Sequence, residues 1–140
     1  NSLPANSLST FGGNPLSSAG ALATIRYMLD HDLQGNSKQM GGRLVEHLAP
    51  AAEACPSVGE LRGRGLMLAF EMVCPGTNEP DADAAARLLE AARARGVLIG
   101  KGGLYGNVLR IAPPMTVTAD EIDEAGEVLT AALGSLTVAG

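Results

Sequence analysis

An arginine interrupts the apolar run NVLRIA at residues 107–112. The run predicts a strand, whose alternate side chains face the core or a cleft, and a guanidinium in such a place needs an acidic partner. An internal carboxylate such as Glu71 would make Arg110 a structural residue, whereas the carboxylate of a ligand would be held by two parallel hydrogen bonds. The residues alone leave both alternatives open.

A second group of polar side chains surrounds the glycine pair in LSTFGGNPLS, residues 8–17. The hydroxyls of Ser9, Thr10 and Ser17 stand near glycine N–H groups, and that combination can hold a phosphate oxygen. Serine and threonine before a helix also serve commonly as caps. The turn is therefore a candidate anion site with an ordinary structural alternative.

Two more basic stretches are expected to be structural. Arg62 and Arg64 alternate with glycines and are predicted to be surface or ion-pair residues, the alternative being that they line a cleft. The loop GKGGLYG, residues 100–106, exposes backbone N–H groups beside Lys101, but its spacing matches neither phosphate-loop motif and a strand follows it. We expect a plain connecting loop.

Other chemistries find no support. His31 and His47 lie on separate predicted helices without Asp or Cys at ligand spacing, so no metal site is expected. There is no G-x-S-x-G motif for nucleophilic hydrolysis. Cys55 and Cys74 are far apart in sequence and are predicted to be free thiols.

Composition and charge limit the partners. The 140 residues carry a net charge of −5 with no basic stripe, so nucleic acid is not an expected partner. No apolar run approaches the ~20 residues of a membrane span, and the first residues lack the order of a signal peptide. We therefore expect one soluble, cytoplasmic domain without a membrane partner. The polar start NSLPANSLST leads straight into a turn with no strand or helix before it, which suggests a piece of something longer.

Periodicity and turn signals place the elements that position these residues. Asn14 and Pro15 begin a helix that Gly35 should end, and Thr118 with Glu121 forms a capping box before the last helix. The predicted helices are about 15–33, 37–54, 83–95 and 119–136. The predicted strands are 58–73, 97–99 and 107–112, and the first of these is divided into two segments by a hinge at Gly63 and Gly65. Gly41 and Gly42 inside the second helix suggest tight packing.

The segment LMLAFEMV, residues 66–73, alternates between two faces. The face of Leu66, Leu68, Phe70 and Met72 should meet the helices, and the opposite face is apolar enough to suggest that something covers it. The order α-α-β-β-α-β-β-α predicts an α+β fold, a two-layer small domain with helices on one face of a mostly antiparallel sheet, preceded by a long connecting helix.

Three stretches, TFGGNPLSSAGALATI, VGELRGRGLMLAFEMV and GLYGNVLRIAPPMTVTADEID, in this order and spacing resemble the C-terminal part of class III aminotransferases. These are fold type I enzymes that use pyridoxal 5′-phosphate, and the resemblance runs from about residue 8 to 136. It implies that residues 1–35 are an N-terminal loop and connecting helix and that residues 36–140 are the small domain. It also implies a homodimer with active sites at the subunit interface.

The resemblance assigns roles to two residues. Thr10 matches the threonine that reaches the cofactor phosphate of the neighbouring subunit, and Arg110 matches the arginine that takes the α-carboxylate of the amino acid substrate. The family's cofactor lysine has no counterpart, because neither Lys38 nor Lys101 stands in its context. No residue of the chain is therefore expected to be catalytic, and the 140 residues alone should be inactive.

The resemblance implies a parent enzyme that moves an amino group from an amino acid to a 2-oxo acid. Because RGRGLMLAFE and LRIAPP also resemble 2,2-dialkylglycine decarboxylases, a decarboxylase or aminomutase of the same family is the nearest alternative. A stand-alone, non-catalytic ligand-binding or interaction domain is a further alternative. The apolar second face of residues 66–73 speaks against it.

Overall fold

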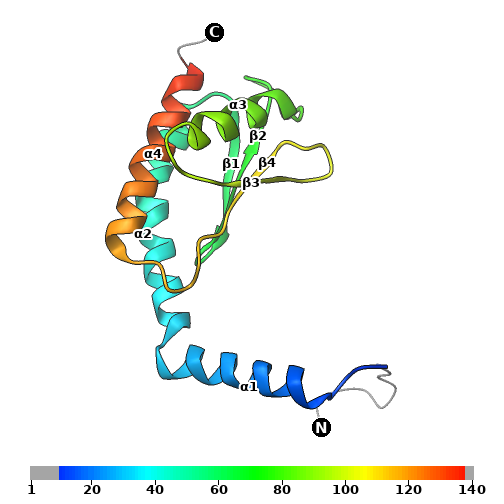
Figure 1. The fold of residues 1–140 in the computed structure, drawn as a ribbon. Coiled ribbons are helices and arrows are strands. Elements are labelled where there is room, and N and C mark those ends of the chain that lie inside the picture. Colours follow the sequence, from blue (N-terminus) through cyan, green and yellow to red (C-terminus); the bar gives the residue numbers. More distant parts are fainter. Residues whose placement is uncertain (1–9, 138–140) are drawn as a thin grey trace. The chain divides into compact units, whose positions relative to one another are not determined.

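The computed structural model of the chain describes residues 10–137 (Figure 1). The chain divides into two compact units between Gln34 and Gly35. The first unit holds helix α1 (Pro15–Asp30), and the second holds the remaining helices and all the strands. Those are α2 (Leu33–Ala54), which begins two residues before the division, β1 (Val58–Arg64), β2 (Met67–Met72), α3 (Ala82–Arg93), β3 (Gly100–Gly102), β4 (Val108–Ile111) and α4 (Ala119–Thr137).

Helix α1 begins as the sequence predicts. The Asn14 side chain accepts a hydrogen bond from the Ser17 amide at 2.9 Å, and Pro15 occupies the first turn. The predicted end near residue 33 was wrong, because Asp32 takes a left-handed backbone conformation at φ 45° and breaks the helix before Gly35. Gly35 consequently lies inside α2 rather than between two helices.

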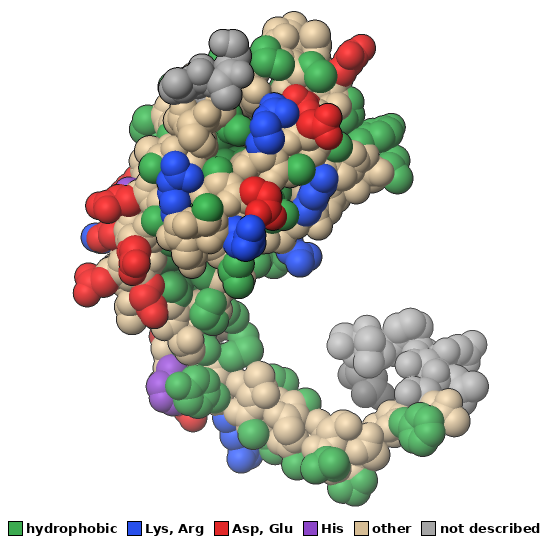
Figure 2. Space-filling model, turned by 45° about the horizontal axis from the view of Figure 1, so that its top comes forward, with side chains coloured by type: hydrophobic (Ala, Val, Ile, Leu, Met, Phe, Trp, Pro, Cys, Tyr) green, Lys and Arg blue, Asp and Glu red, His purple; other side chains and the backbone are tan. Residues whose placement is uncertain are grey.

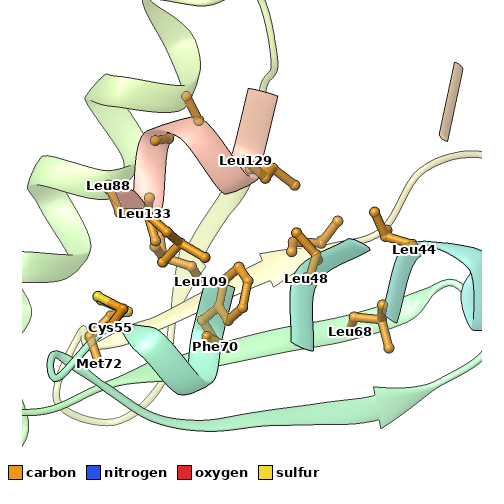
Figure 3. Close-up of a cluster of buried hydrophobic side chains, with 14 of the residues drawn as sticks. Leu44, Leu48, Cys55, Leu68, Phe70, Met72, Leu88, Leu109, Leu129 and Leu133 are labelled. Carbon is orange, nitrogen blue, oxygen red and sulfur yellow. The ribbon is translucent and has the colours of Figure 1, made fainter. Parts of the chain in front are cut away.

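The four strands form one antiparallel sheet in the order β1-β2-β4-β3, with the helices of the second unit on one face. The inward strand residues and the helices enclose the hydrophobic core (Figure 3). Leu66, Leu68, Phe70 and Met72 are all buried, as predicted. The α+β two-layer architecture is thus confirmed.

Strand β3 differs from the sequence prediction. The apolar run at residues 97–99 was expected to pair, but Val97 and Ile99 pack against the core and the strand is Gly100–Gly102. Gly100 pairs with Arg110 and Gly102 with Val108 in the antiparallel register. Glycines carry no β-propensity signal, so the pairing comes from the neighbouring strand β4 rather than from the residues of β3 themselves.

Helix α2 approaches the β1–β2 turn closely at one glycine. A Cβ on Gly41 would lie 2.1 Å from the Gly65 carbonyl oxygen, whereas a Cβ on Gly42 would have no atom within 4 Å. The tight packing that the glycine pair suggested is therefore present at Gly41 and not at Gly42.

Helices α2 and α4 are joined by one carboxylate. Asp123 accepts hydrogen bonds from Arg43 Nε at 2.5 Å and Arg43 Nη2 at 2.6 Å, and His47 Nε2 lies 2.9 Å from the same carboxylate. Hydrogen bonds from Arg43 and then from His47 hold the pKa of Asp123 well below its usual value. The predicted capping box is also confirmed, since the Thr118 amide donates to the Glu121 carboxylate at 2.8 Å.

Replacing the two neighbouring glycines separately should have opposite effects. Gly41→Ala forces a methyl group into the Gly65 carbonyl and should lower the free energy of unfolding by about 2–3 kcal/mol. Gly42→Ala adds a better helix former in open space and should raise it by about 0.5–1 kcal/mol. Urea denaturation of both variants measures the difference. A similar change in both would contradict the close contact.

The Asp123 cluster should make stability depend on pH. A carboxyl whose pKa is depressed on folding stabilises the protein above its unfolded pKa of about 4, and that contribution is lost as the pH falls toward the folded value. Asp123→Asn should therefore lower the thermal midpoint at pH 7, and the difference in thermal midpoint between this variant and the unsubstituted chain should become smaller below about pH 4. Glu124→Gln, one residue along α4, is the control and should have the same thermal midpoint as the unsubstituted chain. A difference for Asp123→Asn that stays constant down to pH 2.5 would refute the account.

Candidate functional site

Arg110 lies on the outer face of the sheet, opposite the helices. Its neighbours Leu109 and Ile111 are buried in the core, while Arg110 itself is exposed. The strand register sets Arg62, Ala69, Arg110 and Gly100 side by side across the four strands. The period of two along β4 therefore points the guanidinium away from the core.

Small residues flank Arg110 on both sides of this row. Ala69 is its partner on β2 and Gly100 its partner on β3. A Cβ on Gly100 would lie 3.5 Å from Arg110 Nη2 and 3.6 Å from Nε, so the guanidinium extends over this glycine. No bulky side chain from either neighbour fills the space beside the guanidinium.

A cavity of about 390 Å³ opens on this face of the sheet. Residues of all four strands line it, among them Arg62, Met67, Ala69, Lys101, Val108 and Arg110. The ionisable groups in the lining are all basic, and Met67 beside them is 70% exposed. The cavity thus offers positive charge next to apolar surface.

The two arginines of the row differ in their partners. Arg62 donates to Glu60 at 2.8 Å and also to Glu71, and these hydrogen bonds, first the one to Glu71, raise the pKa of Arg62. Among the described residues the guanidinium of Arg110 makes no hydrogen bond or ion pair. The alternative in which Glu71 pairs with Arg110 is therefore wrong in this structure, and the expectation that Arg62 is an ion-pair residue is confirmed.

Lys101 lines the cavity from β3, but its side chain belongs to the opposite face of the sheet. Lys101 pairs with Leu109, which faces the core, and its Nζ donates to the Ala82 carbonyl oxygen at 3.2 Å, which ties β3 to the start of α3. In Figure 2, basic and acidic side chains are interspersed over part of the larger unit, and acidic side chains gather at its left edge. The cavity, where the Arg110 guanidinium is not balanced by a carboxylate among the described residues, suits a ligand that carries an anionic group.

The turn before α1 is built by its own residues. Asn14 Nδ2 donates to the Phe11 carbonyl oxygen at 3.0 Å and to Ser17 Oγ at 3.1 Å, so Ser17 belongs to the helix cap. Thr10 is exposed and has no hydrogen bond among the described residues. Ser9 lies outside them. Of the three hydroxyls predicted from the sequence, Thr10 remains the candidate for contacting an anion.

The remaining candidates are structural. His31 stacks on Tyr27 with ring centroids 3.9 Å apart, and His47 belongs to the Asp123 cluster. Cys55 and Cys74 are free, as expected. Within residues 10–137 no group of three His, Cys, Asp or Glu could hold a metal ion, and no helix has the length and apolarity needed to cross a membrane.

Sequence reasoning missed the structural roles of two residues at this sheet. Lys101 was assigned to a loop, but it lies in β3, where it pairs with Leu109 and its Nζ donates to the Ala82 carbonyl oxygen. Asn107 was counted as an ordinary strand residue, but it is buried, and its Nδ2 donates to the Met72 carbonyl oxygen at 2.9 Å while its own carbonyl accepts from the Met72 amide at 2.8 Å. An Asn directly after Gly106 and before an apolar run was the available signal.

Comparison with known families gives one consistent match. The family model described as "Aminotransferase class-III" matches residues 2–133. The 4-aminobutyrate aminotransferase of Mycobacterium tuberculosis is 39% identical over 127 residues, which are 91% of this chain and 28% of that protein. The ornithine aminotransferase of Bordetella pertussis is 41% identical over 116 residues, 82% of this chain and 25% of that protein.

Solved structures agree with these relatives. A Bacillus anthracis aminotransferase superposes with a TM-score of 0.82 at 34% identity, covering 93% of this chain and 30% of that one. A phospholyase from Arthrobacter in complex with phosphoethanolamine gives a TM-score of 0.82 at 35% identity, covering 92% and 31%. The chain spans between a quarter and a third of the length of these proteins.

Proposed function

The chain belongs to the class III aminotransferases, and from this premise we propose that it is the C-terminal part of a pyridoxal-phosphate-dependent transaminase in which Arg110 binds the substrate carboxylate. The observation that carries the proposal is the unpaired guanidinium over a cavity on the outer face of the sheet. An exposed arginine flanked by alanine and glycine can present both N–H donors of its fork to a carboxylate.

The substrates that fit are an amino acid and a 2-oxo acid, because each carries the carboxylate that Arg110 would hold. Relatives of this chain are named for 4-aminobutyrate, 5-aminovalerate and ornithine, which all carry a carboxylate. In this proposal Arg110 binds and orients the substrate from the outer face of the sheet. A fixed carboxylate restricts the rest of the substrate to few orientations, which lowers the entropy cost of reaching the reacting geometry.

The division of the chain supports the proposed domain roles. Residues 1–35 would be the loop and connecting helix, and residues 36–140 the small domain, close to the observed division between Gln34 and Gly35. Helix α1 has no buried residue, and Leu16, Leu22, Ile25 and Leu29 are exposed along it. We propose that the rest of the parent homodimer covers these side chains, with Thr10 contacting the cofactor phosphate of the neighbouring subunit.

Pyridoxal phosphate, when bound, supplies an electron sink for the substrate. The chain fits one contact to it, the exposed hydroxyl of Thr10. Neither lysine is set to hold it, because the Lys101 ammonium donates to the Ala82 carbonyl and Lys38 is exposed on α2. We propose that the cofactor lysine lies outside these 140 residues and that they are inactive alone.

A decarboxylase, aminomutase or lyase parent is the second candidate. The similarity to a phospholyase at a TM-score of 0.82 favours keeping it, since that structure holds phosphoethanolamine, a ligand without a carboxylate. The fate of the amino group separates the candidates. A transaminase delivers it to a 2-oxo acid. A stand-alone binding domain, the third alternative, would need no partner for α1.

Two substitutions in the full-length protein should each weaken a different interaction, one with the substrate and the other with the cofactor. Arg110→Ala removes the charge-assisted hydrogen bonds to the carboxylate and should raise the KM for the amino acid by roughly 10- to 100-fold with cofactor affinity little changed. Thr10→Ala removes one phosphate contact and should loosen the cofactor about two- to fivefold with the amino acid KM little changed. Steady-state kinetics and cofactor titration measure both.

Arg64→Ala is the control for lost charge on the same sheet, since Arg64 is exposed on β1 and is absent from the lining of the cavity. It should leave both quantities within about twofold, as expected for an isolated surface charge. If Arg110→Ala lowers cofactor and substrate binding equally, or only prevents folding, Arg110 is a structural residue and the proposal fails.

The missing lysine can be tested on the 140-residue chain itself. Pyridoxal phosphate followed by borohydride should give no stoichiometric adduct that maps to a single lysine, because the chain lacks a lysine in a cofactor site. Peptide mapping by mass spectrometry reads the result. A stoichiometric adduct at Lys38 or Lys101 would show that the chain carries its own cofactor lysine.

A further inference from the structure

We propose that Arg62 is a positioning residue that holds Glu71 and thereby keeps Arg110 unpaired and available for the substrate carboxylate. The inference rests on the proposed function of Arg110. Arg62 itself does not touch the substrate in this account. It acts on Glu71, the carboxylate among the described residues that lies on the same face of the sheet within reach of Arg110.

The strand register gives Glu71 two basic neighbours. Ala69 pairs with Arg62 on one side and with Arg110 on the other, and Glu71 is two residues along the same face of β2. Glu71 is therefore the diagonal neighbour of both arginines, at the ~7–8 Å Cα spacing that long side chains can bridge. In the structure it pairs with Arg62.

The reason for that choice lies on β1. Glu60 stands directly opposite Glu71 in the register, and two like charges in such a position repel each other. Arg62 Nη1 donates to both carboxylates, to Glu60 at 2.8 Å and to Glu71, and so compensates the repulsion. On β2, Glu71 is the acidic residue within diagonal reach of Arg110. On β4, Glu71 pairs with Val108, which is uncharged, so no second carboxylate stands beside Arg110 on that strand.

Loss of Arg62 should turn Glu71 into a competitor of the substrate. Glu71 would be repelled by Glu60, freed from its cation and left beside the unpaired Arg110. Glu71 would then form an ion pair with Arg110, and this pair would have to break before a substrate carboxylate could bind. The negative charge of Glu71 would also repel an anionic ligand. The side chains of Arg62 and Glu71 are 39% and 37% exposed, so water weakens these effects without removing them.

The test is a double-mutant cycle in the full-length protein, with L-glutamate as the probe and 4-aminobutyrate, which has the same carbon chain without the α-carboxylate, as the control amine. Arg62→Ala should raise the KM for L-glutamate roughly tenfold and leave that for 4-aminobutyrate within about twofold. Arg62→Ala with Glu71→Gln should restore the KM for L-glutamate to within about twofold of the value for the unsubstituted protein. Glu71→Gln in the presence of Arg62 should change that KM by less than about twofold.

Arg62→Ala with Glu60→Gln is the matched control. It removes the other carboxylate that Arg62 holds, which lies on β1 beyond the reach of Arg110, so it should not restore the KM for L-glutamate. A purely structural role of Arg62 predicts no rescue by Glu71→Gln, and a general effect of surface charge predicts equal rescue by both glutamate changes. Either result would overturn the proposal.

A crystal structure of Arg62→Ala gives a readout that does not depend on activity. We expect Glu71 within hydrogen-bond distance of the Arg110 guanidinium, and Glu71 pointing away from Arg110 would contradict the proposal. If Arg110→Ala leaves the KM for L-glutamate unchanged, the proposed function fails instead. If Arg110→Ala raises the KM for L-glutamate and Arg62→Ala does not, only the role of Arg62 is lost.

Discussion

The alternation of side chains along β4 is the constraint on which the site depends. Leu109 and Ile111 must face the helices, because they complete the core above the sheet. Val108 and Arg110 are then committed to the outer face, and a shift of one residue in register would bury the guanidinium. The same core packing that fixes the strand therefore fixes the direction in which Arg110 points.

Charge on the outer face is distributed around that arginine. Glu60 and Glu71 are both held by Arg62, which leaves Arg110 without a carboxylate among the described residues. Alanine and glycine beside Arg110 keep its guanidinium accessible. In our proposal this guanidinium is therefore free to bind the carboxylate of a ligand.

Much of the fold follows from local signals in the sequence. Asn14 with Pro15, the Thr118 and Glu121 capping box and the alternation of residues 66–73 each predict an element that the structure contains. Strand β3 and the break at Asp32 could not be found in this way. The glycines of β3 pair only because β4 lies beside them. The residues around Asp32 contain no motif that predicts its left-handed backbone conformation.

The candidate site was predictable in part. Arg110 stood out because it interrupts an apolar run, but its partner did not, since Glu71 lies diagonal to two arginines and only the register and Glu60 decide between them. The pairing of Lys101 with Leu109 was not predicted either, because the glycines of β3 gave no strand signal. Contacts set by pairing of distant strands are therefore the part that residue types and spacing leave open.

A crystal structure of the full-length protein with a bound substrate carboxylate tests the central claim most directly. The account predicts that the carboxylate oxygens lie within hydrogen-bond distance of the Arg110 guanidinium on the outer face of the sheet, with Glu71 still on Arg62. A carboxylate held by other residues, with Arg110 turned away from it, would contradict the account.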